Sequence, residues 1–136
     1  MSKQQWISFQ LASEQYVHPI DQIKEVIPYS SPVPVPGAPP FTEGILNVRG
    51  EVITVISGRQ LLGLPEPQGL DEGRILIIEG KLERLGISVD RVGSIVHFDQ
   101  RETQALDGEN AHITATIQIG DQLYIVADFS SIPSQP

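Results

Sequence analysis

The sequence contains no cysteine, which excludes disulfide bonds, thiolate metal sites and a cysteine nucleophile, and favours a cytoplasmic protein. It also has no apolar run that approaches the roughly 18 residues of a membrane-spanning helix. The amino-terminal segment MSKQQWISFQ lacks the apolar core of a signal peptide. We therefore expect a soluble protein that does not insert into a membrane.

Basic residues are scarce, because 9 Lys and Arg stand against 17 Asp and Glu and leave a net charge of −8. Such a surface repels phosphate backbones and anionic lipid headgroups, so neither nucleic acid nor direct membrane binding is expected. A chain of 136 residues is long enough for one domain, or for two small subdomains that share a core.

Recognisable catalytic or metal-binding patterns are also missing. The three histidines, His18, His97 and His112, lack the helical i, i+4 spacing of a zinc site. Ser57 does not lie in a nucleophile elbow, and residues 73–81 do not have the spacing of a phosphate loop. We therefore predict no catalytic residue, no metal, no cofactor and no enzymatic activity. A small-ligand-binding or enzymatic barrel protein is the alternative from another functional class.

Short runs of apolar and β-branched residues dominate what the chain does contain. Turn-forming or charged residues separate nearly all of them, and this pattern predicts an all-β sandwich or barrel. Helix is expected only as single turns near Asp21, Ser57 and Asp128. The predicted strand segments are residues 6–11, 16–20, 45–48, 52–56, 75–78, 85–89, 113–119 and 123–127.

Residues 44–64, GILNVRGEVITVISGRQLLGL, hold the clearest local signals. Arg49 and Gly50 interrupt two apolar runs as a tight turn between paired strands would, with Gly50 free to take a positive φ. Ser57 and Gln60 have the spacing of a helix capping box, and Gly63 ends the short helix that follows. The stretch therefore predicts a hairpin followed by a capped helical turn.

A weak internal repeat relates the two halves of the chain. A shift of 69 residues aligns PIDQIKEVI (residues 19–27) with SVDRVGSIV (residues 88–96), and a shift of 71 aligns Ser57 with Asp128. We interpret this as two similar β units with an approximate boundary at residues 65–73. Chance similarity between short β segments is the alternative.

Two irregular segments connect the predicted strands. Six of the thirteen residues 28–40 are proline, which predicts a rigid, extended connector. Its PxxP spacing at Pro36 and Pro39 would also suit an SH3 or WW domain, although an ordered loop strapped across a barrel is the favoured interpretation. Residues 97–112 are polar and are expected to form a loop.

One pair of opposite charges, Glu25 and Arg49, could meet in a compact barrel. A bidentate contact between them would fix the tight turn against residues 23–27. The alternative is that both are independent surface charges, and composition alone favours this alternative.

Several motifs together make the chain similar to the CheW-like domain family of bacterial chemotaxis coupling proteins, which also includes the regulatory domain of the histidine kinase CheA. The most specific is Gly-x-x-Asn-x-Arg-Gly at Gly44, Asn47, Arg49 and Gly50. The other matching segments are FQLASEQYVHPI, IKEVI, PVPGAPP, RQLLGL, ILIIEG, GISVDRV and GDQLYIVADFSSI.

The resemblance implies two intertwined five-stranded SH3-like barrels. It also implies a cytoplasmic, non-enzymatic adaptor, recruited to membrane-associated receptor arrays, that couples the tips of methyl-accepting chemoreceptors to a CheA-type histidine kinase. The residues that match positions tied to receptor or kinase binding are Ile23, Glu25, Gly44, Asn47, Arg49 and Gly50. The resemblance also favours a contact between Glu25 and Arg49 over two independent surface charges. An adaptor of a type IV pilus or other alternative chemosensory system is the second interpretation within this class.

The sequence departs from the family pattern at three places. Ser57-Gly58 replaces the usual Asp-Leu, which keeps the cap but predicts a looser helical turn. Ala115 stands where many relatives have glycine, which makes a positive φ there unfavourable. The sequence ends at Pro136 without the additional carboxy-terminal helix of many coupling proteins, so we expect any surface supplied by that helix to come from elsewhere.

Overall fold

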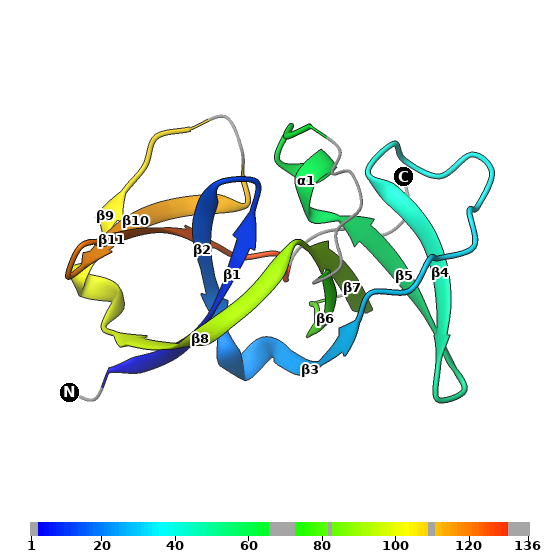
Figure 1. The fold of residues 1–136 in the computed structure, drawn as a ribbon, viewed down its shortest axis with the longest axis horizontal. Helices are drawn as coiled ribbons and strands as arrows, with labels where there is room; N and C mark the ends of the chain where they lie inside the picture. Colours follow the sequence, from blue (N-terminus) through cyan, green and yellow to red (C-terminus); the bar gives the residue numbers. More distant parts are fainter. Residues whose placement is uncertain (1–2, 66–72, 82, 109–110, 131–136) are drawn as a thin grey trace.

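The computed structural model describes residues 3–65, 73–81, 83–108 and 111–130, which form two β-sheets with short helical turns between their strands (Figure 1). The all-β class predicted from the sequence is confirmed. The strands are β1 (Gln4–Leu11), β2 (Glu14–Pro19), β3 (Ile23–Pro28), β4 (Thr42–Val48), β5 (Glu51–Ser57), β6 (Arg74–Glu79), β7 (Arg84–Val89), β8 (Arg91–Phe98), β9 (Gln104–Ala105), β10 (Ile113–Ile119) and β11 (Gln122–Ala127).

The strand order is the same in the two sheets once the repeat is taken into account. One sheet runs β8-β1-β2-β11-β10-β9, and the other runs β3-β6-β7-β5-β4. The 69-residue shift places β1, β2 and β3 on β6, β7 and β8, and the 71-residue shift places β4 and β5 on β10 and β11. The two parallel pairings, β2 with β11 and β7 with β5, occupy equivalent places.

The two repeats exchange strands between the sheets. Each sheet takes the first two strands of one repeat and the last three of the other, so the sheets are intertwined. The small sixth strand β9 also has a counterpart, because the bridge between Val33 and Ile45 matches the pairing of Gln104 with Thr116. The predicted subdomain boundary at residues 65–73 stays a prediction, since both sheets draw strands from either side of it and residues 66–72 lie outside the described part.

The core is continuous across the two sheets. Its largest cluster contains Phe9 and Tyr16 of the first sheet beside Ile56, Leu76 and other residues of the second. A second cluster lies within the six-stranded sheet, where Trp6 stacks on Phe98 with ring centroids 4.4 Å apart. The interior strand β6 is buried on both faces, because Leu76 and Ile78 belong to the main cluster while Ile75 and Ile77 belong to a third. The residues shared in the main cluster are Phe9, Leu11, Tyr16, Ile56, Leu76, Ile78, Leu85, Ile87, Val89, Ala127 and Phe129.

The helical turns agree with the sequence in two places. Turn η1 (Ile20–Gln22) follows β2, and α1 (Gly58–Leu61) follows β5. Ser57 Oγ accepts the Gln60 N–H at 3.1 Å, but the Ser57 N–H donates to Phe41 O at 2.8 Å, so the cap is one-sided. The departure at Gly58 has a packing reason, because a Cβ there would lie 2.7 Å from Ser88 O.

The helical turn expected near Asp128 cannot be compared with the described residues, whereas the loop expected at residues 97–112 can. The turn after Asp128 falls largely on residues 131–136, outside the described part, although Asp128 Oδ1 does accept the Ser130 N–H at 2.9 Å. Within the segment predicted as loop, the structure instead forms turn η2 (Gln100–Glu102). The loop prediction was wrong there because Asp99 and Glu102 form a reciprocal capping box that the sequence reading overlooked.

The proline-rich connector is pinned to the edge of the five-stranded sheet. Val33 and Ile45 exchange two backbone hydrogen bonds of 2.9 Å. This close approach requires glycine at position 44, which has φ +147° and whose Cβ would lie 2.1 Å from Val33 O. Ala115, the equivalent residue of the second repeat, is not among the described residues with positive φ.

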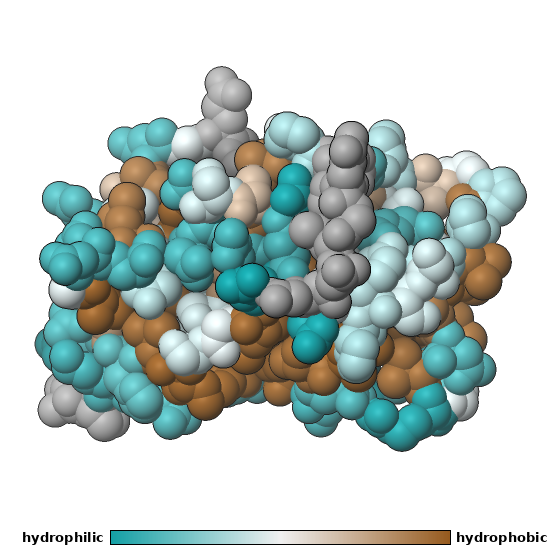
Figure 2. All heavy atoms as spheres, viewed as in Figure 1, coloured by the Kyte–Doolittle hydropathy of each residue, from teal (hydrophilic) through white to brown (hydrophobic). Residues whose placement is uncertain are grey.

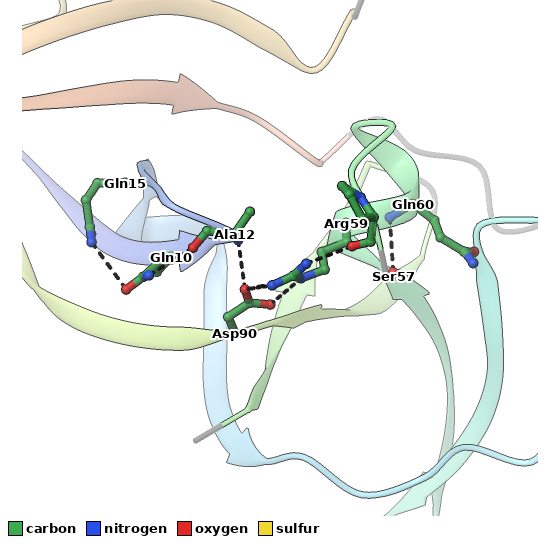
Figure 3. Close-up of polar contacts among 8 residues, drawn as sticks. Gln10, Ala12, Gln15, Ser57, Arg59, Gln60 and Asp90 are labelled. Atoms are coloured by element: carbon green, nitrogen blue, oxygen red, sulfur yellow. Dashed lines mark hydrogen bonds and ion pairs between the residues drawn. The ribbon is translucent and has the colours of Figure 1, made fainter. Parts of the chain in front are cut away.

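A largely buried ion pair joins the two sheets (Figure 3). Asp90 lies between β7 and β8 and accepts hydrogen bonds from Arg59 of α1 and from the Ala12 N–H, the latter at 2.7 Å. The Arg59 and Asp90 side chains are only 14% and 10% exposed. Because Ala12 belongs to the β1–β2 turn, one carboxylate holds the turn of the first sheet against the helix of the second.

Candidate functional site

A polar hollow of about 320 Å³ lies at one end of the five-stranded sheet, beside the β4–β5 turn. Strongly hydrophilic side chains gather at the lower right of Figure 2, where Figure 1 shows this turn. The hollow combines charged side chains at its rim with apolar ones from central strands. Its lining residues are Lys24, Glu25, Val48, Arg49, Glu51, Ile53, Ile77 and Arg84.

The β4–β5 connection is a two-residue hairpin turn. Val48 pairs with Glu51, and the residues between them, Arg49 and Gly50, have φ values of +50° and +86°. Positive φ at both central positions is typical of a type I′ turn, whose twist matches the flanking strands. Asn47 Oδ1 accepts the Gly50 N–H at 2.8 Å and stabilises this geometry. The tight turn and the positive φ of Gly50 are therefore confirmed.

Glu25 and Arg49 form the ion pair that the family resemblance favoured, through one hydrogen bond from Arg49 Nη2 to Glu25 Oε1 in place of the expected bidentate contact. Glu25 lies on β3, at one edge of the five-stranded sheet, and Arg49 lies in the turn that follows β4, at the other edge. The contact shows that the sheet curls until its edges approach each other. The Arg49 side chain is 72% exposed, and exposed ion pairs typically stabilise a fold by only about 0–1 kcal/mol. The pair therefore does more to fix a surface than to hold the sheet together.

Arg84 forms a second ion-paired group beside the first, which the sequence reading missed. Its Nη1 donates to Glu51 at 2.6 Å, and its Nε donates to Glu79 at 2.9 Å. The hydrogen bond to Glu79 is the main cause of the raised pKa of Arg84. Glu79 and Arg84 pair across the β6–β7 connection. Their opposite charges at the two ends of a short connection were the sequence feature from which this ion pair could have been predicted.

The structure brings together four of the six residues that match the family's binding positions. Glu25, Asn47, Arg49 and Gly50 surround the β4–β5 turn. Ile23 instead packs against the main core, and Gly44 is buried under the connector. A binding role for any of the six stays a prediction. The exposed residues of the turn are the ones that a partner could contact directly.

His18 is a buried residue whose hydrogen bonds give it a structural role. Its side chain is fully buried and stacks on Phe129. Nε2 accepts the Phe129 N–H at 3.0 Å, so the neutral ring carries its proton on Nδ1, which donates to Pro19 O at 3.1 Å. Burial lowers the pKa of His18, and it also lowers the pKa of half-buried His112. His18 therefore remains neutral and holds the segment that follows β11.

The described residues contain no group of three or more His, Asp or Glu side chains arranged to hold a metal ion. Within the same part of the chain, no helix is long and apolar enough to cross a membrane.

Comparisons with known proteins agree with this geometry. The model of the CheW-like domain matches residues 5–135. The chemotaxis protein CheW of Treponema pallidum is 30% identical over 94% of this chain and 81% of its own length. CheW of Bacillus subtilis is 32% identical over 73% of this chain, and the match spans 64% of that protein. The crystal structure of the scaffolding protein TtCheW from Thermoanaerobacter tengcongensis superimposes with a TM-score of 0.84 at 27% identity, covering 93% of this chain and 89% of TtCheW. The chain belongs to the CheW-like domain family.

Proposed function

We propose that this protein is a non-enzymatic scaffolding adaptor of chemotaxis, which couples methyl-accepting chemoreceptors to a CheA-type histidine kinase. The observation that carries the proposal is the exposed, ion-paired turn of the CheW-like motif, set in a fold whose solved relative is a scaffolding protein. Receptor state would then reach the kinase through contacts of this domain, with no reaction catalysed by the adaptor itself.

The proposed docking surface is the end of the five-stranded sheet around the β4–β5 turn. Arg49 and Asn47 are exposed there and offer a guanidinium and an amide to a partner. Gly50 permits the turn, and Glu25 orients Arg49. Gly44 and Ile23 would act from behind the surface, since Gly44 seats the connector and Ile23 anchors the start of β3 in the core.

The physical character of this surface suits a reversible assembly. Charged side chains on an otherwise ordinary surface steer encounter and fix register more than they add affinity. Weak signalling contacts of modest area can then exchange as the array responds. We further propose that the protein works in the cytoplasm, at arrays of membrane-bound receptors.

Reconstitution tests the proposal directly. The purified protein is mixed with a CheA-type kinase and a receptor signalling fragment from the same organism, and autophosphorylation is followed with and without receptor ligand. We expect kinase activity to become receptor-dependent only when the adaptor is present. Failure to bind the kinase regulatory domain, together with unchanged autophosphorylation, would contradict the coupling role. Co-purification from native cells would identify the partners and distinguish flagellar taxis from a pilus-type system.

A further inference from the structure

The two repeats provide an internal control for the hollow beside the β4–β5 turn. Three cations line it, Lys24, Arg49 and Arg84, although the whole chain has only 9 Lys and Arg. The equivalent residues of the other sheet are Gly93, Gly120 and Gln15, by the shifts of 69, 71 and 69 residues. The end of the five-stranded sheet therefore carries three cations at positions that are neutral in the six-stranded sheet.

The neutral counterparts show that the fold does not require these charges. Glu79 and Arg84 pair across β6 and β7, and their equivalents Gln10 and Gln15 pair across β1 and β2 in the same register. Gln15 Nε2 lies 3.5 Å from Gln10 Oε1, so amides occupy the place of the ion pair (Figure 3). The same backbone thus forms with glutamines, which argues against a purely structural reason for the charged set.

Three cations and two carboxylates line the hollow, and Glu79 just beyond the lining is a third carboxylate, so the group as a whole carries no net formal charge. The two carboxylates of its lining are already engaged, Glu25 by Arg49 and Glu51 by Arg84. Among the described residues, Lys24 is the cation of this lining that has no ion pair. Glu79 lies just beyond the lining and holds Arg84 through Nε at 2.9 Å, which aims the guanidinium without filling its remaining N–H donors.

We infer that this hollow receives an acidic side chain of the docking partner, an Asp or Glu held by Arg84 together with Lys24 and Arg49. The inference rests on the proposed function, because it names the chemistry by which the same surface selects its partner. Two carboxylates fix the planar guanidinium of Arg84, so its remaining N–H groups point in a set direction. A guanidinium held in this way binds an incoming carboxylate with better-defined geometry than a freely rotating ammonium group does. Arg84 is then a specificity-determining residue, and Glu51 and Glu79 are its positioning residues.

The test is binding of two probes, the purified regulatory domain of the CheA-type kinase and a soluble receptor signalling fragment. The variants are Lys24→Gln, Arg84→Gln and the double variant, which copies the neutral end of the other sheet. Lys81→Gln, an exposed cation outside the hollow lining, is the matched control. Affinity is measured at low and at moderate salt, and circular dichroism checks that each variant is folded.

We expect the double variant to bind one of the two probes about tenfold more weakly than wild type, with a shallower salt dependence, while Lys81→Gln leaves both unchanged. The partner's acidic residues are then replaced one at a time by Gln or Asn. One of these replacements should weaken binding to the wild-type protein but cause no further loss of affinity for the double variant. Unchanged affinity and salt dependence in folded variants would overturn the inference while leaving the proposed function intact. Failure of wild type to bind either probe would reject both. Lys24→Gln keeps the test valid even if Arg84→Gln does not fold.

Discussion

The β4–β5 and β10–β11 turns occupy equivalent places in the two sheets but differ in chemistry. Both are two-residue hairpins, and each is followed by an exposed apolar residue, Val52 at 63% and Leu123 at 47% exposure. The first turn carries Arg49, whereas the second has Gly120 at the same place. The backbone differs as well, because Arg49 and Gly50 both have positive φ, whereas in the second turn Gly120 does and Asp121 does not. The duplicated architecture therefore keeps the two-residue hairpin and its exposed apolar neighbour, and the two ends differ in charge and turn conformation, which is why we propose a docking surface at the first.

Other positions related by the repeat also differ in charge or in burial. Asp90 is buried and paired with Arg59, while its equivalent Asp21 is exposed. Where one repeat has the buried His18, the other has the buried Ile87. Each difference allows a substitution to be compared with its matched position, and the predictions that follow run from the largest expected effect on stability to the smallest.

Asp90→Ala should destabilise the fold by about 3 kcal/mol, because it leaves the Arg59 guanidinium largely buried without its carboxylate and removes the acceptor of the Ala12 N–H. Asp21→Ala, at the exposed equivalent, should change stability by less than about 0.5 kcal/mol. Urea unfolding of both variants provides the comparison. Equal, small losses would show that the ion pair does not hold the two sheets together.

Gly44→Ala should cost about 2 kcal/mol, because alanine is strained at φ +147° and its Cβ would meet the Val33 carbonyl. The reverse change in the other repeat, Ala115→Gly, should cost only about 1 kcal/mol through greater freedom of the unfolded chain. Thermal unfolding measures both. If Gly44→Ala were as stable as wild type, the connector would not be pinned as closely as the structure shows.

Stability should fall as the pH drops below the ordinary histidine range. Burial lowers the pKa of His18 in the folded state, against weaker raising effects of Pro19 O, Asp128 and Asp21, so the unfolded chain takes up a proton more readily. The contribution is complete above about pH 6.5 and is lost as the pH falls toward the folded pKa. Urea unfolding midpoints at two pH values, one above and one below this range, measure the effect.

His18→Gln keeps a possible acceptor for the Phe129 N–H and should reduce that pH dependence. His112→Gln is the necessary companion, because burial lowers the pKa of His112 as well and gives the same sign. A wild-type protein whose stability did not change across this range would contradict the neutral, buried assignment of His18.

Arg49→Ala should change stability by less than about 1 kcal/mol, because its ion pair is exposed. It should nevertheless weaken binding to the kinase regulatory domain or the receptor fragment. Asp121→Ala, in the equivalent turn, should leave stability nearly unchanged and should not weaken binding at this surface. A large loss of stability in Arg49→Ala would instead make Arg49 a structural residue.

Local signals in the sequence were sufficient for eight of the eleven described strands and for the β4–β5 turn, whereas β3, β8 and β9 were not predicted. β-branched runs separated by turn residues define the strands, and Arg49-Gly50 marks a connection that only positive φ values allow. The exchange of strands between the sheets was implied by the family resemblance but could not be read from periodicity. A period-two pattern shows which face of a strand is buried and carries no information on which strand lies beside it.

Long-range polar contacts were the hardest part to predict. Glu25 and Arg49 were singled out from their places in the chain, and the family resemblance then favoured their contact. Arg59 with Asp90, and Arg84 with Glu51, instead join residues 31 and 33 positions apart that no local pattern connects. The Asp99–Glu102 capping box was visible in principle, but the polar composition around it favoured a loop. Ion pairs between such distant segments can be identified only once the fold shows which charged residues lie together.

Exchange of the charges of Glu25 and Arg49 tests most directly whether this end of the protein is a docking surface. Arg49→Glu alone places two like charges together and should weaken binding and slightly lower stability. The combined variant E25R/R49E can re-form the ion pair within the chain, so we predict that it recovers wild-type stability while its binding to kinase domain and receptor fragment stays weak. Full recovery of binding in E25R/R49E would contradict this, because it would show that the pair acts only by holding the turn.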